Sequence, residues 1–363
     1  MSEGAPGRPM KMPSHIRLER VPSLDALGDE WGRLARESGN VFSTWEWAST
    51  WWRHQGRKRV PLVFACRAAD DRLAAVLPLY LWSARPLRVA RFIGHGPADQ
   101  LGPICPPSAR VLAAKALRSA CEEARLDALL AELLPGDGWD SALDAKPLRL
   151  ESSPILSLAK GWEAYLAARS ANFRQQIRRR ERKLRSEHAV RFRLATDLTR
   201  LQDDLGVLFS LHVARWGKAG SAFLRWERFH RDFAAVALQQ GWLRLWFLEL
   251  DDRPVAAWYG FRFAGIESYY QAGRDPARSD ESVGFVLLAH TIREAAQDGM
   301  HEYRLLRGAE AFKRRFAEAD PGLRTFVLER GVPGRIARIA AAGGLRSDRV
   351  RLLLRRLAAV TTS

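Results

Sequence analysis

The segment Leu305–Lys313 contains the side chains best suited to chemistry. Arg307 and Gly308 follow an apolar run that predicts a strand, and Glu310 opens a short predicted helix that carries Lys313. Arginine suits planar recognition of phosphate or carboxylate, and a carboxylate with a raised pKa can take a proton from an attacking amine or hydroxyl. Each residue has a structural alternative: an ion pair for Arg307, a helix cap for Glu310 and an exposed surface position for Lys313. We expect Glu310 to act as a catalytic base, and Arg307 and Lys313 to hold an anionic cosubstrate.

Three further residues are candidates for contact with a substrate. His212 and Trp216 stand four residues apart in a predicted helix, so both lie on one face of it. The alternative for His212 is a histidine at the edge of the core with a satisfied hydrogen bond. Asp99 occupies a loop rich in glycine and proline, where functional side chains and ordinary Asx turns are both common. We predict a catalytic role for His212 and substrate binding by Trp216 and Asp99.

A predicted apolar helix that begins near Val283 offers a site for an anion. The first N–H groups of a helix have no intrahelical partner, and the helix dipole favours negative charge there. Small residues let an anion approach the backbone closely. The alternative is an N-cap at Asp280 or Ser282, with Gly284 serving close packing. We predict cosubstrate binding by four residues: Gly273, Ser282, Val283 and Gly284.

Positive charge is concentrated in two segments. The formal net charge is +17 at pH 7, and most of the excess lies in 172–185 and 331–363. The first segment predicts a helix with apolar residues on one face and arginines on another. A solvated arginine face is the ordinary expectation; the alternative is that Arg178 and Arg182 bind an acidic substrate, such as a lipid-linked sugar phosphate, CoA or tRNA. The second segment predicts a basic amphipathic helix that either docks on the chain or contacts an anionic membrane surface.

The predicted elements divide the chain into two units. Its 363 residues, 47% of them hydrophobic and 27% charged, suit two folded domains with flanking tails. We expect a disordered leader at 1–14, a first unit at 15–155, a second at 158–330 and a basic helical tail at 331–363. The second unit runs through helices, an antiparallel meander, a helix, a strand, a helix and a last strand at Leu323–Leu328. This order indicates an α+β fold.

Simple counts argue against several classes of protein. No stretch approaches the roughly 18 uninterrupted apolar residues needed to span a bilayer, and the amino terminus has no signal-peptide pattern. Cys66, Cys105 and Cys121 lack C-x-x-C spacing, so we expect neither a disulfide framework nor a zinc site. The expectation is a cytoplasmic protein without metal, membrane-peripheral if the basic tail binds lipid.

A longer pattern resembles a known family. It joins His212 and Trp216 to the following runs, in this order: Pro254–Ala257, Tyr269–Tyr270, Gly273, Ser282–Gly284 and Leu306–Lys313. These residues resemble the CelD-like subfamily of GNAT acetyltransferases, which is associated with cellulose and exopolysaccharide biosynthesis. The resemblance implies that acyl-CoA or acetyl-CoA is the cosubstrate and that its phosphates bind at the start of the central helix.

The first unit carries a weaker resemblance. Phe42–Thr44 with Trp47, and Gly94 followed by Asp99, are similar to the opening of this family and of the Fem-type peptidoglycan aminoacyltransferases. Those relatives have two tandem GNAT-like (acyl-CoA N-acyltransferase) units, each a mixed, mainly antiparallel sheet flanked by helices, with the cleft between them. The resemblance implies this fold here, with a degenerate first unit. One departure is Phe312, which stands where the family often has a tyrosine.

The resemblance implies an N- or O-acyltransferase that moves an acyl group from acyl-CoA to an amine or hydroxyl of a small-molecule or lipid-linked sugar, or of another cell-envelope precursor. Two alternatives remain open. One is aminoacyl transfer from charged tRNA, which the basic helix would suit. The other is a non-catalytic scaffold of a polysaccharide synthase.

Overall fold

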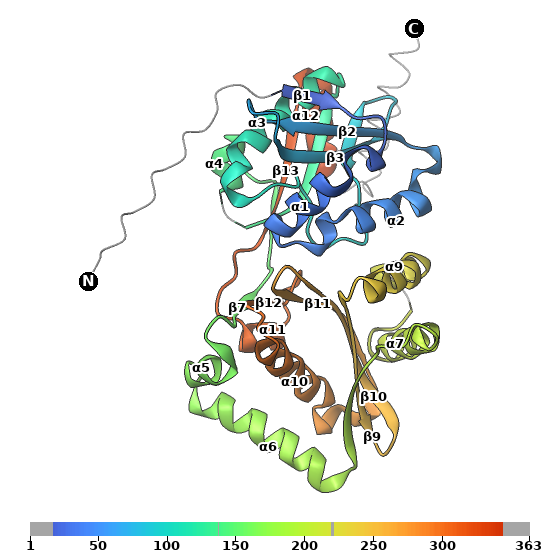
Figure 1. Cartoon of the computed structure of the whole chain (residues 1–363), viewed down its shortest axis with the longest axis vertical. Helices are drawn as coiled ribbons and strands as arrows, with labels where there is room; N and C mark the ends of the chain where they lie inside the picture. The colour runs from blue at the N-terminus through green and yellow to red at the C-terminus, as the bar shows by residue number, and fades with distance from the viewer. Residues whose placement is uncertain (1–16, 137, 219–220, 344–363) are drawn as a thin grey trace, which may run out of the picture.

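The chain forms two β-sheets with helices around them (Figure 1). The computed structural model describes residues 17–136, 138–218 and 221–343, so the predicted leader 1–14 and the tail from 344 onward lie outside the described residues. In the first sheet the strand order is β1-β2-β3-β4-β5-β13-β6, and in the second it is β7-β12-β11-β10-β9-β8. The described residues include no helix with the length and apolar character to cross a bilayer.

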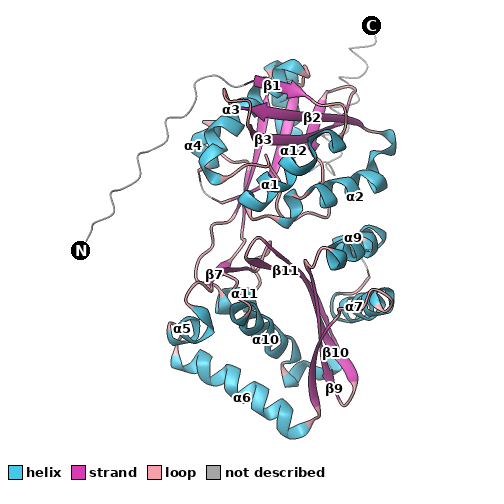
Figure 2. Cartoon of the chain, viewed as in Figure 1, coloured by secondary structure: helices cyan, strands magenta, loops and turns pink. Residues whose placement is uncertain are grey.

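The first sheet and its helices come mainly from the amino-terminal half (Figure 2). Its strands are β1 (Arg17–Arg20), β2 (Val60–Arg67), β3 (Leu73–Ser83), β4 (Val89–Phe92), β5 (Ala128–Pro135), β6 (Arg149–Glu151) and β13 (Leu323–Glu329). Its α-helices are α1 (Gly28–Ser38), α2 (Trp45–Gln55), α3 (Arg110–Glu123), α4 (Trp139–Leu143) and α12 (Gly331–Gly343). Short 3₁₀ turns cover Leu24–Leu27, Val41–Ser43, Gly56–Lys58 and Pro107–Ala109.

The second sheet lies between two groups of helices (Figure 1). Its strands are β7 (Ile155–Ser157), β8 (Val190–Leu194), β9 (Leu243–Leu250), β10 (Arg253–Phe263), β11 (Ile266–Arg274) and β12 (Glu302–Arg304). One face carries α5 (Gly161–Ala167), α6 (Ala171–Glu187), α10 (Val283–Gln297) and α11 (Ala311–Phe316), and the other carries α7 (Leu201–Trp216), α8 (Ala222–Arg225) and α9 (Glu227–Gln239). A 3₁₀ turn, η5 (Pro276–Glu281), precedes α10.

Local sequence explains the elements that frame the site. The helix α6 begins after Ser170, whose hydroxyl accepts the N–H of Phe173 at 3.2 Å. Its apolar residues at helical spacing, Phe173, Ile177 and Leu184, are buried, as the sequence predicts. The turn between β9 and β10 holds Asp251 at a positive φ of 51°, which aspartate tolerates better than most residues. The predicted amphipathic helix and meander are therefore both present.

Both sheets repeat one topology. In each, three antiparallel strands are followed by a helix and a strand that pairs in parallel with the third: β2-β3-β4-α3-β5 in the first and β9-β10-β11-α10-β12 in the second. The remaining pairs in each sheet are antiparallel. The expectation of an α+β fold with two mixed, mainly antiparallel sheets is confirmed.

The predicted domain boundary is wrong for the last strand. Residues 323–329 form β13, which enters the first sheet between β5 and β6 instead of completing the second. Its side chains Leu323 and Phe326 are buried there. The apolar pattern predicts a strand but does not encode its partner, because a long connection can carry the strand to either sheet. The described part of the tail, α12, continues onto this sheet and buries Ala337 beside β5.

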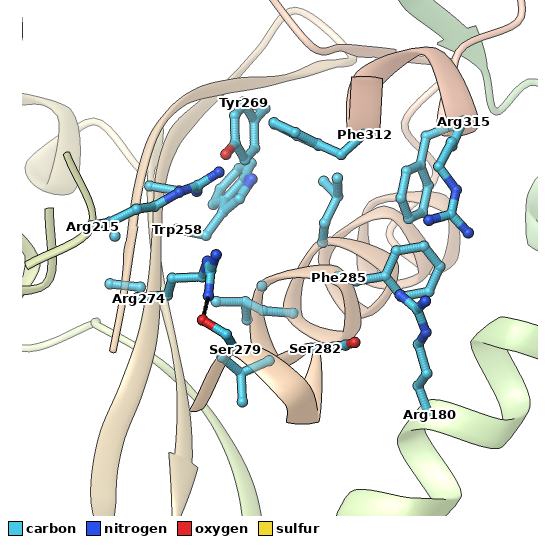
Figure 3. Close-up of a pocket in the computed structure, with 18 residues that line it drawn as sticks. Arg180, Arg215, Trp258, Tyr269, Arg274, Ser279, Ser282, Phe285, Phe312 and Arg315 are labelled. Atoms are coloured by element: carbon cyan, nitrogen blue, oxygen red, sulfur yellow. Dashed lines mark hydrogen bonds between the residues drawn. The ribbon is translucent and has the colours of Figure 1, made fainter. Parts of the chain in front are cut away.

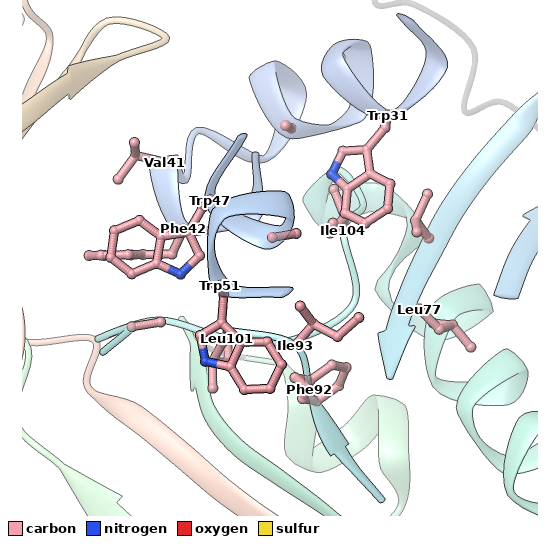
Figure 4. Packing of buried hydrophobic residues seen from close by; sticks show 14 of the residues in the cluster. Trp31, Val41, Phe42, Trp47, Trp51, Leu77, Phe92, Ile93, Leu101 and Ile104 are labelled. Carbon is pink, nitrogen blue, oxygen red and sulfur yellow. The ribbon is translucent and has the colours of Figure 1, made fainter. Parts of the chain in front are cut away.

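Aromatic side chains join the two units into one core. Trp47 of α2 packs edge-on against Phe42 at 4.7 Å between ring centroids, and against Phe229 and Phe233 of α9 at 4.8 and 4.6 Å. Figure 4 shows the part of this cluster that lies under α1 and α2, with the Trp47 and Phe42 rings in contact. Because this buried cluster is continuous from the first sheet to α7 and α9, the two units hold a fixed relation to each other.

Candidate functional site

Four arginines line a cavity of ≈ 230 Å³ in the second unit, which we call the arginine cavity. They come from four elements: Arg180 of α6, Arg215 of α7, Arg274 of β11 and Arg315 of α11. Among the described residues, no aspartate or glutamate lines it. Arginine clusters without carboxylates favour phosphate or another anion.

Two of these guanidinium groups lie against one aromatic ring at the cavity wall (Figure 3). Arg180 is 4.5 Å and Arg315 is 5.1 Å from the ring centroid of Phe285. Burial, and then the charges of Arg315 and Arg179, lower the pKa of Arg180. These guanidinium groups are partly buried, and no carboxylate among the described residues of the cavity lining neutralises them. An anionic ligand would therefore relieve the repulsion between the positive charges.

The helix α10 starts at this cavity. Ser282 precedes it in the left-handed region at φ 57°, and its carbonyl accepts the N–H groups of Phe285 and Val286. The amides of Val283 and Gly284 therefore remain as donors at the helix start, as expected for the first turn. Ser282, Val283 and Gly284 all line the cavity. The structure thus brings three predicted cosubstrate residues together with the arginines.

The second half of β11 has one open edge. Its parallel pairing with β12 ends at Ser268, whereas its pairing with β10 continues to Arg274. The β10 register passes from Gln271 directly to Tyr269, so Tyr270 is a bulge. Among the described strands, none covers the free edge of Tyr269–Arg274. Unpaired strand backbone can hydrogen-bond an extended ligand, and bulges are frequent beside active sites.

A second cavity of ≈ 350 Å³, which we call the polar cavity, adjoins the first. Both cavities are lined by Arg215, Tyr269, Ala272 and Phe312. Four of the ionisable residues that the sequence singled out also line the polar cavity: His212, Arg307, Glu310 and Lys313. Asp99 lines neither cavity. An elongated ligand in the arginine cavity would therefore meet a second ligand at this shared wall.

Lys313 is buried in the polar cavity, with only 4% of its side chain exposed. Its Nζ donates to the carbonyl of Arg307 at 2.6 Å and lies 3.2 Å from Oε2 of Glu310. Burial lowers the pKa of Lys313, while Glu310 and Asp99 oppose that shift. The surface position that the sequence left as an alternative for Lys313 is therefore excluded. Because Lys313 lines the polar cavity and not the arginine cavity, its expected contact with cosubstrate phosphate is not supported.

Glu310 precedes α11 without capping it by a side-chain hydrogen bond. Its carboxylate folds back over Gly308, where an added Cβ would come 2.2 Å from Oε2 of Glu310. Gly308 also has a φ of 128°, which favours glycine. The predicted turn after the buried Leu305 and Leu306 is confirmed. Arg307 emerges from it half-exposed, and its Nε donates to Glu151 at 2.5 Å, which is the ion pair expected as its structural alternative.

Asp99 reaches this region from the first unit. The loop that carries it docks on the second sheet, because the hydroxyl of Tyr270 donates to the carbonyl of Pro97 at 2.5 Å and Arg304 donates to Gln100 at 3.3 Å. Burial raises the pKa of Asp99 to about 6, against the opposing effects of Lys313 and Arg307. A carboxylate with this pKa suits proton transfer near neutral pH.

His212 is buried with both ring nitrogens engaged. Nδ1 lies 3.1 Å from the carbonyl of Ala272, and Nε2 lies 3.1 Å from the hydroxyl of Ser221. Burial lowers the pKa of His212. This arrangement matches the hydrogen-bonded core-edge histidine that the sequence left as an alternative. Trp216 of the same helix is 51% exposed at the rim of the polar cavity, with the Arg215 guanidinium 4.3 Å from its ring centroid.

Gly273 lines the arginine cavity, but close packing explains its identity. An added Cβ would come 2.3 Å from the backbone nitrogen of His212, so only glycine lets α7 approach β11 so closely. A role for Gly273 in binding therefore remains a prediction, whereas its packing role follows from the structure.

The basic helix contributes to the site through a residue that the sequence analysis missed. Arg178 and Arg182 are exposed and line neither cavity, so their binding of an acidic substrate remains a prediction. Arg180 lines the arginine cavity instead. Its position three residues after Ile177 and four before Leu184 places it beside the buried face of α6, a signal that the spacing contains.

The geometry agrees with a comparison of the chain with protein families. Residues 171–314 match the model of an acetyltransferase (GNAT) domain. The match is to that domain in general, so the CelD-like resemblance remains a prediction. Among curated proteins, none matches the chain.

Solved structures share the fold of most of the chain at low sequence identity. FemX is 11% identical with a TM-score of 0.61, covering 86% of this chain and 95% of that one. The carboxy-terminal domain of a putative lysylphosphatidylglycerol synthetase from Agrobacterium fabrum is 10% identical (TM-score 0.55; 90% and 99% covered). L-PGS from Bacillus licheniformis is 13% identical (TM-score 0.53; 87% and 96% covered). The family match over residues 171–314 identifies this part of the chain as a GNAT-type acetyltransferase domain.

Proposed function

We propose that this protein transfers an acyl group from acyl-CoA, with acetyl-CoA as the simplest case, to an amine or hydroxyl of a sugar or other cell-envelope precursor. The observation that carries the proposal is the meeting of two cavities at one wall. One is lined by four arginines and a helix start, and the other by ionisable side chains. This is the arrangement that transfer between an anionic donor and a separate acceptor requires.

The arginine cavity supports an acyl-CoA donor. The α10 amides of Val283 and Gly284, with Arg180 and Arg315, would hold phosphate. The thioester arm would lie along the open edge of β11 and bring its carbonyl to the shared wall at Tyr269. Positioning of donor and acceptor in contact would supply much of the rate.

The polar cavity supports an acceptor that loses a proton on attack. Glu310, the base expected from the sequence, has an exposed carboxylate beside Lys313. Asp99 is a second candidate for the base. It lines neither cavity, but it interacts electrostatically with Lys313 and Arg307 of the polar cavity, and burial raises its pKa to about 6. Trp216 offers an exposed ring on which a sugar could rest. A role in polysaccharide biosynthesis belongs to this proposal and follows from the CelD-like resemblance.

One observation favours a second function, aminoacyl transfer from tRNA. Arg178, Arg179 and Arg182 are exposed on the outer face of α6, and within the described part of the chain none of the three forms an ion pair. A row of cations next to the donor cavity would suit a polyanionic carrier.

A thermal-shift measurement with CoA and with tRNA separates the alternatives. The acyl-CoA function predicts that CoA raises the melting temperature, by an amount that grows with the logarithm of its concentration above Kd, and that acetyl-CoA is consumed in the presence of glucosamine. The tRNA function predicts binding that weakens steeply with salt. A protein that binds neither would be the scaffold that the sequence left open.

A further inference from the structure

A hydrogen-bonded pair of side chains, Ser221 and His212, lies in the wall of the polar cavity. Nε2 of His212 is 3.1 Å from Oγ of Ser221, and Nδ1 is 3.1 Å from the carbonyl of Ala272. Among the described residues, Ser221 is the one aliphatic hydroxyl that lines this cavity. Ala272 lines both cavities and lies on the open edge of β11. The pair is therefore anchored to the strand edge along which the donor would lie.

The partners of the His212 ring fix where its protons are. A backbone carbonyl can only accept, so Nδ1 carries the proton that it donates to Ala272. In the neutral ring Nε2 then has a free lone pair, and the hydroxyl of Ser221 donates to it. Burial lowers the pKa of His212, against the opposing effect of the Ala272 carbonyl. The ring is therefore neutral at pH 7 and able to take a proton.

This arrangement is the one that makes a serine nucleophilic. It needs a hydroxyl within hydrogen-bond reach of a base, and a third group that holds the base in orientation. The structural alternative is a helix cap, since Ser221 precedes α8 and accepts the N–H of Leu224 at 3.3 Å. That bond uses a lone pair of Oγ and leaves the hydroxyl proton directed at His212. Capping and activation are therefore compatible, and only activation uses the imidazole.

We propose that Ser221 accepts the acyl group as an ester before the acceptor does, with His212 as its base. The inference rests on the proposed acyl-CoA function and adds a covalent intermediate to it. Oγ of Ser221 forms a bond to the thioester carbonyl carbon while its proton passes to Nε2 of His212. The carbon–sulfur bond breaks with its electron pair on sulfur, which takes that proton to give the free thiol.

The second half-reaction moves the acyl group to the acceptor. The acceptor nitrogen or oxygen forms a bond to the ester carbon and gives its proton to the carboxylate base, Glu310 or Asp99. The carbon–oxygen bond to Ser221 breaks with its electron pair on Oγ, and the proton of the base returns to Oγ through water. Each cycle thus converts thioester and acceptor into acylated acceptor and thiol, and the thiol can leave before the acceptor binds.

Acetyl-CoA without an acceptor provides the first test. The wild type should release the CoA thiol in a burst equal to the protein concentration. Mass spectrometry of the intact chain and of its peptides should find a single acetyl group, on Ser221. The isolated acetyl-protein should then pass this group to hydroxylamine. Steady-state rates with acetyl-CoA and hydroxylamine should give parallel lines in double-reciprocal plots, as a double displacement requires.

Variants separate the nucleophile from the helix cap. Ser221→Asn keeps a favourable N-cap for α8 but removes the hydroxyl. We expect no acetyl group at this position and a kcat lower by at least about 10²-fold, because the base-assisted attack is lost. CoA affinity and the melting temperature should stay at wild-type values. His212→Gln should slow the burst while Ser221 remains the acetylated residue. Ser210→Asn in α7, at an exposed serine that lines neither the arginine nor the polar cavity, is the matched control.

The outcomes separate this inference from the function beneath it. If the wild type does not consume acetyl-CoA with or without hydroxylamine, the acyl-CoA function fails and the acyl-serine with it. If the wild type is active, three results contradict the acyl-serine alone. These are converging lines without a burst, an acetyl group found only on residues other than Ser221, and a Ser221→Asn protein whose kcat is unchanged or falls only with its stability.

Discussion

Glu310 and Arg307 face the polar cavity with different partners. Glu310 contacts the buried Lys313, and Arg307 pairs with Glu151 of β6. If Glu310 is the base, Glu310→Gln should lower kcat by about 10²–10⁴-fold with little change in melting temperature. Arg307→Lys should also be damaging, because a point charge does not reproduce the planar fork. Turnover and thermal unfolding of the same preparations distinguish a catalytic from a structural role, because loss of a structural role would lower mainly the melting temperature.

The raised pKa of Asp99 leads to a prediction about how stability depends on pH. Its pKa in the folded protein, about 6, lies above its ordinary value of 3.8, so the native state binds this proton more tightly than the unfolded chain. The stability that this group contributes is therefore full below pH about 4 and is lost as the pH rises through about 6. Asp99→Asn should lack this loss and be the more stable protein at pH 8.

The same substitution tests the base. If Asp99 accepts the acceptor's proton, kcat/KM of the wild type should rise with pH through an inflection near 6 that Asp99→Asn lacks. An inflection that persists in Asp99→Asn but vanishes in Glu310→Gln would assign the proton transfer to Glu310 instead.

At the scale of elements, ligand binding at the start of α10 and at the outer face of α6 can be tested separately. A Cβ at Gly284 would lie 3.5 Å from Cδ of Arg274, an ordinary contact, so Gly284→Val should fold. The further methyl groups would crowd the amides where phosphate is expected. Loss of charge-assisted hydrogen bonds of about 1.5–3 kcal/mol corresponds to roughly 10- to 100-fold weaker CoA binding. Gly206→Val in α7, where an added Cβ meets nothing within 4 Å, is the control. Wild-type CoA affinity in a folded Gly284→Val protein would rule out this phosphate site.

Replacing Arg178, Arg179 and Arg182 of α6 by glutamine addresses the acidic ligand. Because the three side chains lie outside both cavities, CoA affinity should stay unchanged. If the α6 face binds tRNA, its affinity should fall and the slope of log K against log salt should flatten by about 2–3. The same change at three exposed cations of the first unit, Arg20, Arg57 and Lys58, controls for net charge. An unaltered slope would indicate that this face of α6 is only solvated and does not bind tRNA.

At the scale of the whole molecule, the first sheet depends on the carboxy-terminal part of the chain, because β13 is one of its strands. Phe326 of β13 is fully buried and pairs with Ala131 of β5. Phe326→Ala should cost about 3–5 kcal/mol in the free energy of unfolding. Because the aromatic core is continuous between the units, we expect one cooperative transition in calorimetry. Two transitions, with only one of them shifted, would show that the units unfold independently.

The sequence by itself determined the local architecture and the type of domain. Apolar spacing identified α6 by Phe173, Ile177 and Leu184, because burial of one helix face makes apolar residues recur at the helical period. The run around Ser282 marked the start of α10. The residues Leu305 to Lys313 predicted the end of a strand, a turn at Gly308 and a helix; in the structure β12 ends at Arg304 and α11 begins at Ala311.

Only the tertiary structure decided which elements meet. It placed β13 in the first sheet, buried Lys313 beside Glu310 in the polar cavity and brought Asp99 to the second unit. It also selected Arg180 over Arg178 and Arg182 as the residue of α6 that enters a cavity. Apolar patterning specifies that a strand or helix face is buried, but the partner that buries it is chosen by long-range packing, which no local period records.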